Sequence, residues 1–91
     1  MKKRLIIKIH GLVQGVFFRA CANQKAVELK LLGSVENLPD GTVVIVAEGE
    51  EASLKELLIW SKNGPELAQV ENVESEWQNA TGEFTEFQVL Y

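Results

Sequence analysis

Two stretches of this 91-residue chain carry apolar residues at helical spacing, and each has a single apolar face. We predict helices over residues 20–32 and 51–63, where apolar residues recur at steps of three and four. The predicted faces comprise Ala22, Ala26 and Leu29, with Cys21 or Leu32, in the first helix and Leu54, Leu57, Leu58 and Ser61 in the second. A helix with one apolar face has to bury it against another element, so both helices must cover a sheet.

The other apolar residues are spaced for strands. Their alternation predicts strands over residues 3–10, 34–38, 42–47 and 68–77, and a last strand within 84–91. The resulting order is strand, helix, strand, strand, helix, strand, with the last segment split into the strands at 68–77 and within 84–91. This order is that of the split βαβ plan. We therefore predict an α+β, ferredoxin-like βαββαβ fold with a mostly antiparallel sheet and both helices packed on one face.

Turn-forming residues separate the predicted elements. Gly33 follows the first helix, where a left-handed glycine commonly ends a helix. The sequence Pro-Asp-Gly at 39–41 predicts the tight turn of a hairpin, and Asn-Gly-Pro at 63–65 ends the second helix. No linker or repeat interrupts this pattern, so we expect residues 1–91 to form one domain.

Composition limits the compartment and the partners. The chain is 46% hydrophobic and 24% charged, and no apolar run approaches the ~20 residues of a membrane-spanning helix. A single cysteine fits a reducing compartment, and the amino terminus lacks the apolar stretch of a secretory signal, so we predict a cytoplasmic protein. A net charge of −4 argues against a nucleic-acid partner.

The charge is unevenly distributed along the chain. The first nineteen residues carry five Lys and Arg and no acid, whereas residues 66–86 carry six glutamates and no Lys or Arg. A basic amino-terminal end can attract a small anion. A solvated strand face explains the same residues equally well.

The stretch GLVQGVFFR, residues 11–19, joins the first strand to the first helix. Glycines at 11 and 15 let the backbone curl and approach a ligand closely. The amides at a helix start are unpaired and lie at the positive end of the helix dipole, so together with the planar fork of Arg19 they can hold an anion. The loop can be anchored to the core by Val13, Val16, Phe17 and Phe18. Spacing alone also fits a plain glycine-bearing connection, which is a common feature before a helix.

Other phosphate and metal motifs are absent. A P-loop needs four residues between its glycines and then Lys with Ser or Thr, but three residues separate Gly11 from Gly15, and Val16 follows. A cysteine phosphatase needs its thiolate before the anion loop, whereas Cys21 follows Arg19. No Asp-x-Asp, Rossmann fingerprint, cysteine pair or histidine cluster is present, and no metal or cofactor is expected.

Five segments, in this order, resemble those of a known family. They are GLVQGVFFR at 11–19, NLPDG at 37–41, VVIVAEGEE at 43–51, NGP at 63–65 and TGEFTEFQV at 81–89. With these motifs the chain resembles the acylphosphatases from about Arg4 to Tyr91. The first segment is the most specific of them.

The resemblance implies hydrolysis of acyl phosphates to a carboxylate and inorganic phosphate. It implies that Arg19 and Asn37 are catalytic, with Asn37 orienting the attacking water. The phosphoryl group would be held by the loop amides of Gln14, Gly15, Val16, Phe17, Phe18 and Arg19. Without the resemblance, Asn37 is a typical residue for opening a turn. We expect a monomer whose only partners are a small acyl phosphate and phosphate, with no metal and no membrane partner. The alternative is a non-catalytic anion-binding or regulatory module of the same fold.

Three residues depart from the family pattern. Ser34 stands where an aromatic is usual, Ala22 where Ser or Thr is usual, and Glu36 where a cation often precedes Asn37. A carboxylate within a Debye length of phosphate weakens binding, unless strand alternation points it away. We expect Glu36 to raise KM rather than abolish activity, and His10 to have a packing role.

Overall fold

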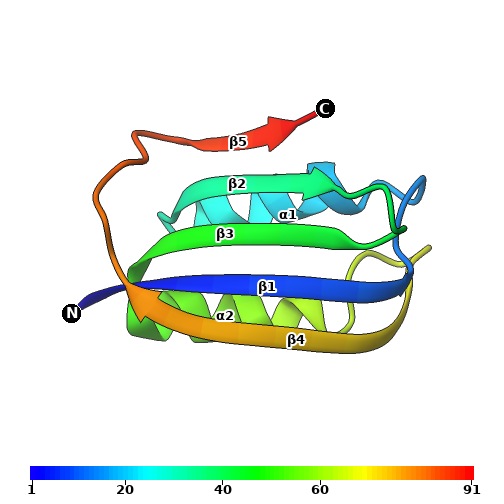
Figure 1. The fold of residues 1–91 in the computed structure, drawn as a ribbon, viewed down its shortest axis with the longest axis horizontal. Coiled ribbons are helices and arrows are strands. Elements are labelled where there is room, and N and C mark those ends of the chain that lie inside the picture. The colour runs from blue at the N-terminus through cyan, green and yellow to red at the C-terminus, as the bar shows by residue number, and fades with distance from the viewer.

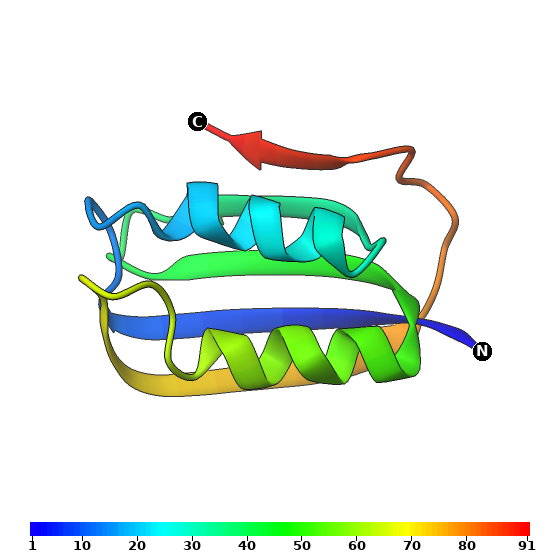
Figure 2. The same cartoon turned by 180° about the vertical axis from the view of Figure 1, so that it is seen from behind.

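A computed structural model describes residues 1–91 as a five-stranded sheet with two helices on one of its faces (Figures 1 and 2). The elements are β1 (Lys2–Leu12), α1 (Phe18–Glu28), β2 (Leu32–Asn37), β3 (Val43–Glu50), α2 (Glu51–Ser61), β4 (Gln69–Asn79) and β5 (Phe87–Leu90). The strand order is β4-β1-β3-β2-β5, and only the β2–β5 pair is parallel. The predicted fold class and order of elements are confirmed.

Strand directions bring four segments to one edge of the sheet. Since β1 and β2 are both antiparallel to β3, they run in the same direction, and β5 is parallel to β2. The carboxyl ends of β1, β2 and β5 therefore lie at one edge, on the right in Figure 1. The loop after β1 and the start of α1 lie at this edge as well.

The core lies between the sheet and the two helices. Leu5, Ile7 and Ile9 alternate along β1 with residues of the opposite face, and all three are fully buried. The buried apolar residues are Leu5, Ile7, Ile9, Val13, Val16, Phe18, Ala22, Ala26, Leu31, Val35, Val43, Ile45, Ala47, Leu54, Leu57 and Phe87. Both predicted helix faces contribute to this set, so burial of the two apolar stripes holds the helices on the sheet.

The end of α1 differs from the prediction. The helix ends at Glu28, and Lys30 rather than Gly33 is the left-handed residue that terminates it, with φ 60°. The N–H of Leu31 donates to Ala26 O at 2.9 Å and that of Lys30 to Val27 O at 3.0 Å, which is the Schellman pattern. The buried Leu31 supplies the apolar contact of this motif, so burial outweighs the cost of a left-handed lysine.

Gly33, the predicted helix stop, lies inside β2 instead. It is required there by close packing of the backbone. A Cβ at this position would lie 1.8 Å from Val46 O of the neighbouring β3.

A polar cluster holds residues 80–86 in place, which connect β4, the outer strand on one side of the sheet, to β5, the outer strand on the other. Buried Glu48 accepts hydrogen bonds from Thr81 N at 2.9 Å, Gly82 N at 3.0 Å and Arg4 Nε at 2.7 Å. Arg4 also donates to Glu83 and lies over the Phe84 ring. Burial by itself raises the pKa of the Glu48 carboxyl. The hydrogen bonds from these donors together lower the pKa by more than burial raises it, and the resulting pKa is about 2.

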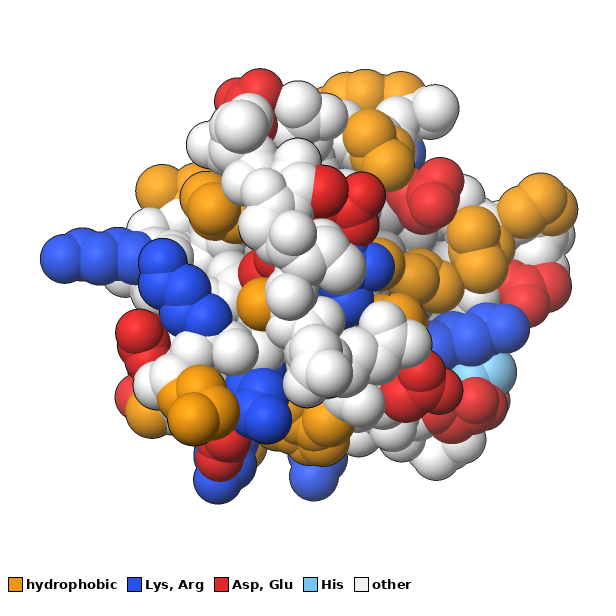
Figure 3. Space-filling view, turned by 60° about the vertical axis from the view of Figure 1, so that its left-hand side comes forward, with side chains coloured by type: hydrophobic (Ala, Val, Ile, Leu, Met, Phe, Trp, Pro, Cys, Tyr) orange, Lys and Arg blue, Asp and Glu red, His pale blue; other side chains and the backbone are white.

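Two of the four Lys and Arg residues that precede the loop, Arg4 and Lys8, are paired with acids. Besides Arg4, Lys8 Nζ lies 3.2 Å from Asp40, and His10 Nε2 lies 2.9 Å from Glu74. On the face shown in Figure 3, basic and acidic side chains are interspersed and no single basic patch forms. Lys2, Lys3, Arg4 and Lys8 therefore belong to β1 and do not form one basic patch.

Neither helix is long and apolar enough to cross a bilayer. The cytoplasmic location remains a prediction.

The left-handed lysine generates a stability prediction. Replacing Lys30 with glycine should raise the free energy of unfolding by about 1 kcal/mol, because glycine adopts positive φ without strain. Urea denaturation measures the change. Lys25→Gly, inside the same helix, is the control and should lose about 1 kcal/mol. A Lys30→Gly variant no more stable than the wild type would contradict this account of the helix end.

The Glu48 cluster predicts a pH-dependent contribution to stability. Since the folded-state pKa lies below the usual 4.5, the cluster stabilises fully above about pH 4.5, and its contribution is lost as the pH falls towards 2. Glu48→Gln should cost about 1–3 kcal/mol at neutral pH. The difference from the wild type in urea unfolding should shrink steadily over the acidic range. A difference that is constant with pH would show that the charge of Glu48 is unimportant.

Candidate active site

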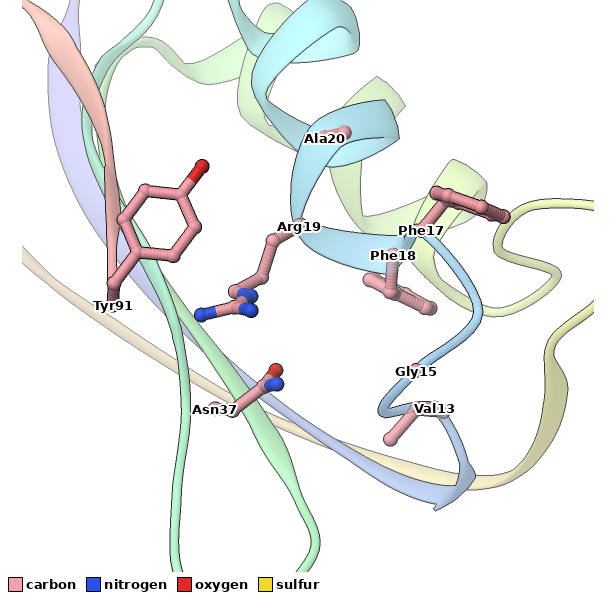
Figure 4. Close-up of a pocket in the computed structure, with 8 residues that line it drawn as sticks. All are labelled: Val13, Gly15, Phe17, Phe18, Arg19, Ala20, Asn37 and Tyr91. Atoms are coloured by element: carbon pink, nitrogen blue, oxygen red, sulfur yellow. The ribbon is translucent and has the colours of Figure 1, made fainter.

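A cavity of about 250 Å³ opens at the edge where β1, β2 and β5 end (Figure 4). Its walls come from four separate segments: the loop after β1, the first turn of α1, the end of β2 and the residue after β5. The lining residues are Val13, Gly15, Phe17, Phe18, Arg19, Ala20, Asn37 and Tyr91.

The loop and the first turn of α1 present a run of unpaired amides. None of the backbone N–H groups of residues 14–20 donates to an acceptor in the protein. Gly15 and Phe17 both have positive φ, at 74° and 65°, and alternate with other conformations. Alternation of this kind turns successive N–H groups towards a common side, as in anion-binding nests. The segment therefore has the backbone chemistry of an anion site.

The apolar residues of the loop anchor it, with one exception. Val13, Val16 and Phe18 are buried as expected, and the Phe18 ring packs edge-on against Trp60 at 5.3 Å. The expectation that Phe17 also anchors the loop is wrong, since 70% of it is exposed. Its left-handed backbone directs the side chain away from the core. A strained, exposed aromatic residue is typical of a functional site rather than of a packing position.

Arg19 projects into the cavity without an acidic partner. The guanidinium makes no ion pair and instead donates from Nη1 to Leu90 O at 3.1 Å. Its central carbon lies 4.8 Å from the centroid of the Tyr91 ring (Figure 4). The end of the chain thus orients the cation while leaving its charge uncompensated.

Asn37 is the last residue of β2 and faces Arg19 across the cavity (Figure 4). Its Oδ1 is buried and has no hydrogen-bond partner in the protein. Buried polar atoms are normally paired, so this oxygen is available to a ligand or a water. By strand alternation Asn37 shares the helix-covered face with the buried Val35, and Glu36 points to the other face. Because Glu36 points away from the face of Asn37, we expect its carboxylate to weaken phosphate binding only slightly.

The hairpin that follows Asn37 is braced from two sides. Asp40 accepts from Thr42 N at 3.0 Å and from Thr42 Oγ1 at 2.6 Å. These bonds, chiefly the one from the hydroxyl, lower the pKa of Asp40 to about 2. From the other side, the Gln14 amide donates to Leu38 O at 2.8 Å and to Thr42 O at 3.0 Å.

Five of the predicted site residues line one cavity: Gly15, Phe17, Phe18, Arg19 and Asn37. Two others of the predicted loop do not line it. Val16 is in the core and the Gln14 side chain contacts the hairpin, although their amides belong to the unpaired run.

Gly11 also differs from its predicted role. A Cβ there would lie 2.2 Å from Gln69 O, so Gly11 serves the approach of β4 rather than that of a ligand. Tyr91, Ala20 and the Leu90 carbonyl were missed. No local pattern identifies Tyr91 and the Leu90 carbonyl, because the parallel pairing of β5 with β2 places them. Ala20 directly follows Arg19 in the first turn of α1.

Comparison with known proteins gives the same family as the motifs. The family model described as Acylphosphatase matches residues 5–89. The chain belongs to the acylphosphatase family. An acylphosphatase of Methylococcus capsulatus is 51% identical over 88 residues, which are 97% of this chain and 96% of that protein.

Solved structures of acylphosphatases share the whole fold. The crystal structure of acylphosphatase from Bacillus subtilis has a TM-score of 0.94 at 33% identity and covers all of both chains. An acylphosphatase from Coxiella burnetii has a TM-score of 0.91 at 39% identity, covering 98% of this chain and 93% of that one. The acylphosphatase fold of this chain therefore extends from end to end.

Two departures from the family pattern lie away from the cavity in this acylphosphatase. Ala22 is fully buried between α1 and the sheet, where its small side chain allows close packing. Ser34 is half-buried on the open face, paired with Val46 of β3, away from the helix-covered face of Asn37. Neither residue lines the cavity.

Proposed function

We propose that this acylphosphatase hydrolyses acyl phosphates in the cavity between Arg19 and Asn37. The amides of residues 14–19 and the Arg19 guanidinium hold the phosphoryl group, and Asn37 orients the water that attacks it. One observation carries the proposal. An unpaired cation, an unpaired amide oxygen and a run of unpaired N–H groups, from three separate elements, meet at one cavity.

The leaving group explains why such a sparse site suffices. A carboxylate has a conjugate-acid pKa near 4, so it departs without a proton from the enzyme. None of the lining residues is Asp, Glu, His or Cys. The tasks left to the protein are to stabilise the phosphoryl oxygens and to place the water in line.

The phosphoryl oxygens carry the charge that the site has to stabilise. Arg19 offers a planar fork with several donors, and the loop amides add fixed dipoles close to the anion. Because Arg19 makes no ion pair with the protein, its full charge is available to the ligand. Its hydrogen bond to Leu90 O and the Tyr91 ring fix its direction before the substrate binds.

The water is aimed by the free oxygen of Asn37. Oδ1 accepts one O–H of the water, which points a lone pair of the water oxygen at phosphorus. The new P–O bond forms as the bond from phosphorus to the acyl oxygen breaks, and the carboxylate leaves with that electron pair. Both protons of the water end on phosphate, giving a carboxylate and dihydrogen phosphate with no covalent enzyme intermediate.

We propose that the enzyme is a monomer and uses no metal and no other cofactor. A regulatory module of this fold would bind phosphate yet leave an acyl phosphate intact. Turnover of acetyl phosphate at neutral pH, followed in the presence of a chelator and corrected for spontaneous hydrolysis, separates the two functions. Loss of substrate no faster than the spontaneous rate would reject the enzyme.

Asn37→Ala tests the placement of the water. We expect kcat for acetyl phosphate to fall about a hundred-fold, since the nucleophile loses its orienting acceptor. The inhibition constant of phosphate should stay within about two-fold, because the oxyanion contacts remain.

Asn79→Ala is the matched control, at the far end of the sheet beside Lys3. It should keep wild-type kinetics. Turnover by Asn37→Ala within a few-fold of the wild type would remove Asn37 from the mechanism.

Arg19→Lys tests the fork. A single ammonium cannot reproduce the planar set of donors, so we expect kcat/KM to fall about a hundred-fold or more, with weaker phosphate inhibition. Arg4→Lys, at the other arginine of the chain, should lower stability and leave kcat/KM near the wild-type value. If Arg19→Lys retained most of the wild-type kcat/KM, a single positive charge would be sufficient at this position.

A further inference from the structure

We propose that the Gln14 side chain is a positioning residue that sets the distance between the phosphate-holding loop and the water-orienting Asn37. This inference rests on the proposed roles of Arg19 and Asn37. It gives the side chain of Gln14 a task separate from that of its backbone amide.

The two halves of the site reach the cavity from different elements. The pairing of β1 with β3 ends at Ile9 and Val43, and that of β2 with β3 ends at Asn37 and Val43. Beyond these last pairs no ladder hydrogen bond holds the loop against the hairpin. Ladder hydrogen bonds by themselves therefore do not hold the loop residues 13–17 against the hairpin.

Gln14 makes the polar link beyond the ladder. Its Nε2 donates to Leu38 O at 2.8 Å, directly after Asn37, and to Thr42 O at 3.0 Å on the other side of the turn. Thr42 O also accepts from Leu38 N at 2.9 Å, so the bridge spans the base of the turn. These are the only hydrogen bonds between residues 13–19 and residues 36–43.

The chemistry of the bridge requires an amide nitrogen. Both acceptors are backbone carbonyls, and the two protons of one NH₂ group satisfy both. A carboxylate at this position would present an acceptor to two acceptors. An apolar side chain would leave the half-buried carbonyls with one donor fewer and release the hairpin from the loop.

The consequence for catalysis is specific. Arg19 and the loop amides belong to one half, so loss of the bridge should leave phosphate binding intact. Asn37 belongs to the other half, so its water should be misplaced relative to phosphorus. A misplacement of about 1 Å can cost on the order of a hundred-fold in rate. We therefore expect the loss in kcat, with little change in affinity for the anion.

The test uses Gln14→Met, which keeps the length of the side chain and removes the donors. We expect kcat for acetyl phosphate to fall about ten- to a hundred-fold, while the inhibition constant of phosphate stays within about two-fold. Gln24→Met, on the exposed surface of α1, is the matched control and should match the wild type. An unchanged kcat, or a phosphate inhibition constant that rises as much as kcat falls, would overturn the proposal.

A double-mutant cycle separates this inference from the function on which it rests. If Gln14 acts through Asn37, adding Gln14→Met to Asn37→Ala should lower kcat by less than about two-fold further. Full additivity of the two losses would show that Gln14 acts elsewhere. Wild-type turnover by Asn37→Ala alone would instead reject the role of Asn37.

Gln14→Glu provides a second variant if the methionine variant folds poorly. Its carboxyl group can donate one hydrogen bond only when protonated. The kcat of Gln14→Glu relative to the wild type should therefore rise between about pH 6 and about pH 4. A ratio that does not change over this range would contradict a role for the donors.

Discussion

The site depends on the direction of three strands. Because β1 and β2 both pair antiparallel with the β3 that lies between them, and β5 pairs parallel with β2, their carboxyl ends share one edge. The helix that follows β1 must begin at this edge too. Strand pairing thus brings its free amides, Asn37 and the carbonyl of Leu90 to the same end of the sheet. Open sheets with parallel neighbours commonly place ligands at such an edge.

The same arrangement divides stability from function. Arg4, Glu48 and Thr81 satisfy one another at the opposite end of the sheet, where the chain crosses towards β5. At the end of the sheet that carries the cavity, the polar groups are unpaired instead. Arg19 makes no ion pair, and Asn37 Oδ1 accepts no hydrogen bond from the protein. Unpaired groups cost folding free energy, and a protein retains them where a ligand supplies the missing partner. The two arginines of the chain therefore have opposite surroundings.

Local chemistry and tertiary contacts combine in the loop. Gly15 and Phe17 give the backbone its left-handed turns, and Val13 and Phe18 fasten it to the core. The loop is thereby fixed in itself, and its only hydrogen bonds to the hairpin come from Gln14. For a reaction whose leaving group needs no acid, such positioning is the main contribution that a protein can make.

The sequence by itself determined the order of elements, the faces of both helices and the core, because apolar periodicity is a local property that burial enforces. Through the resemblance to the acylphosphatases, the motif at 11–19 and Asn37 also predicted an anion-holding loop and a water-orienting amide, and these roles remain proposals. Tertiary structure alone decided that Lys30 rather than Gly33 ends α1, that Phe17 is exposed, and that Tyr91 lies over Arg19. These features arise from contacts between residues far apart in the chain, such as Gly33 against Val46 and β5 beside β2. No local pattern records such contacts.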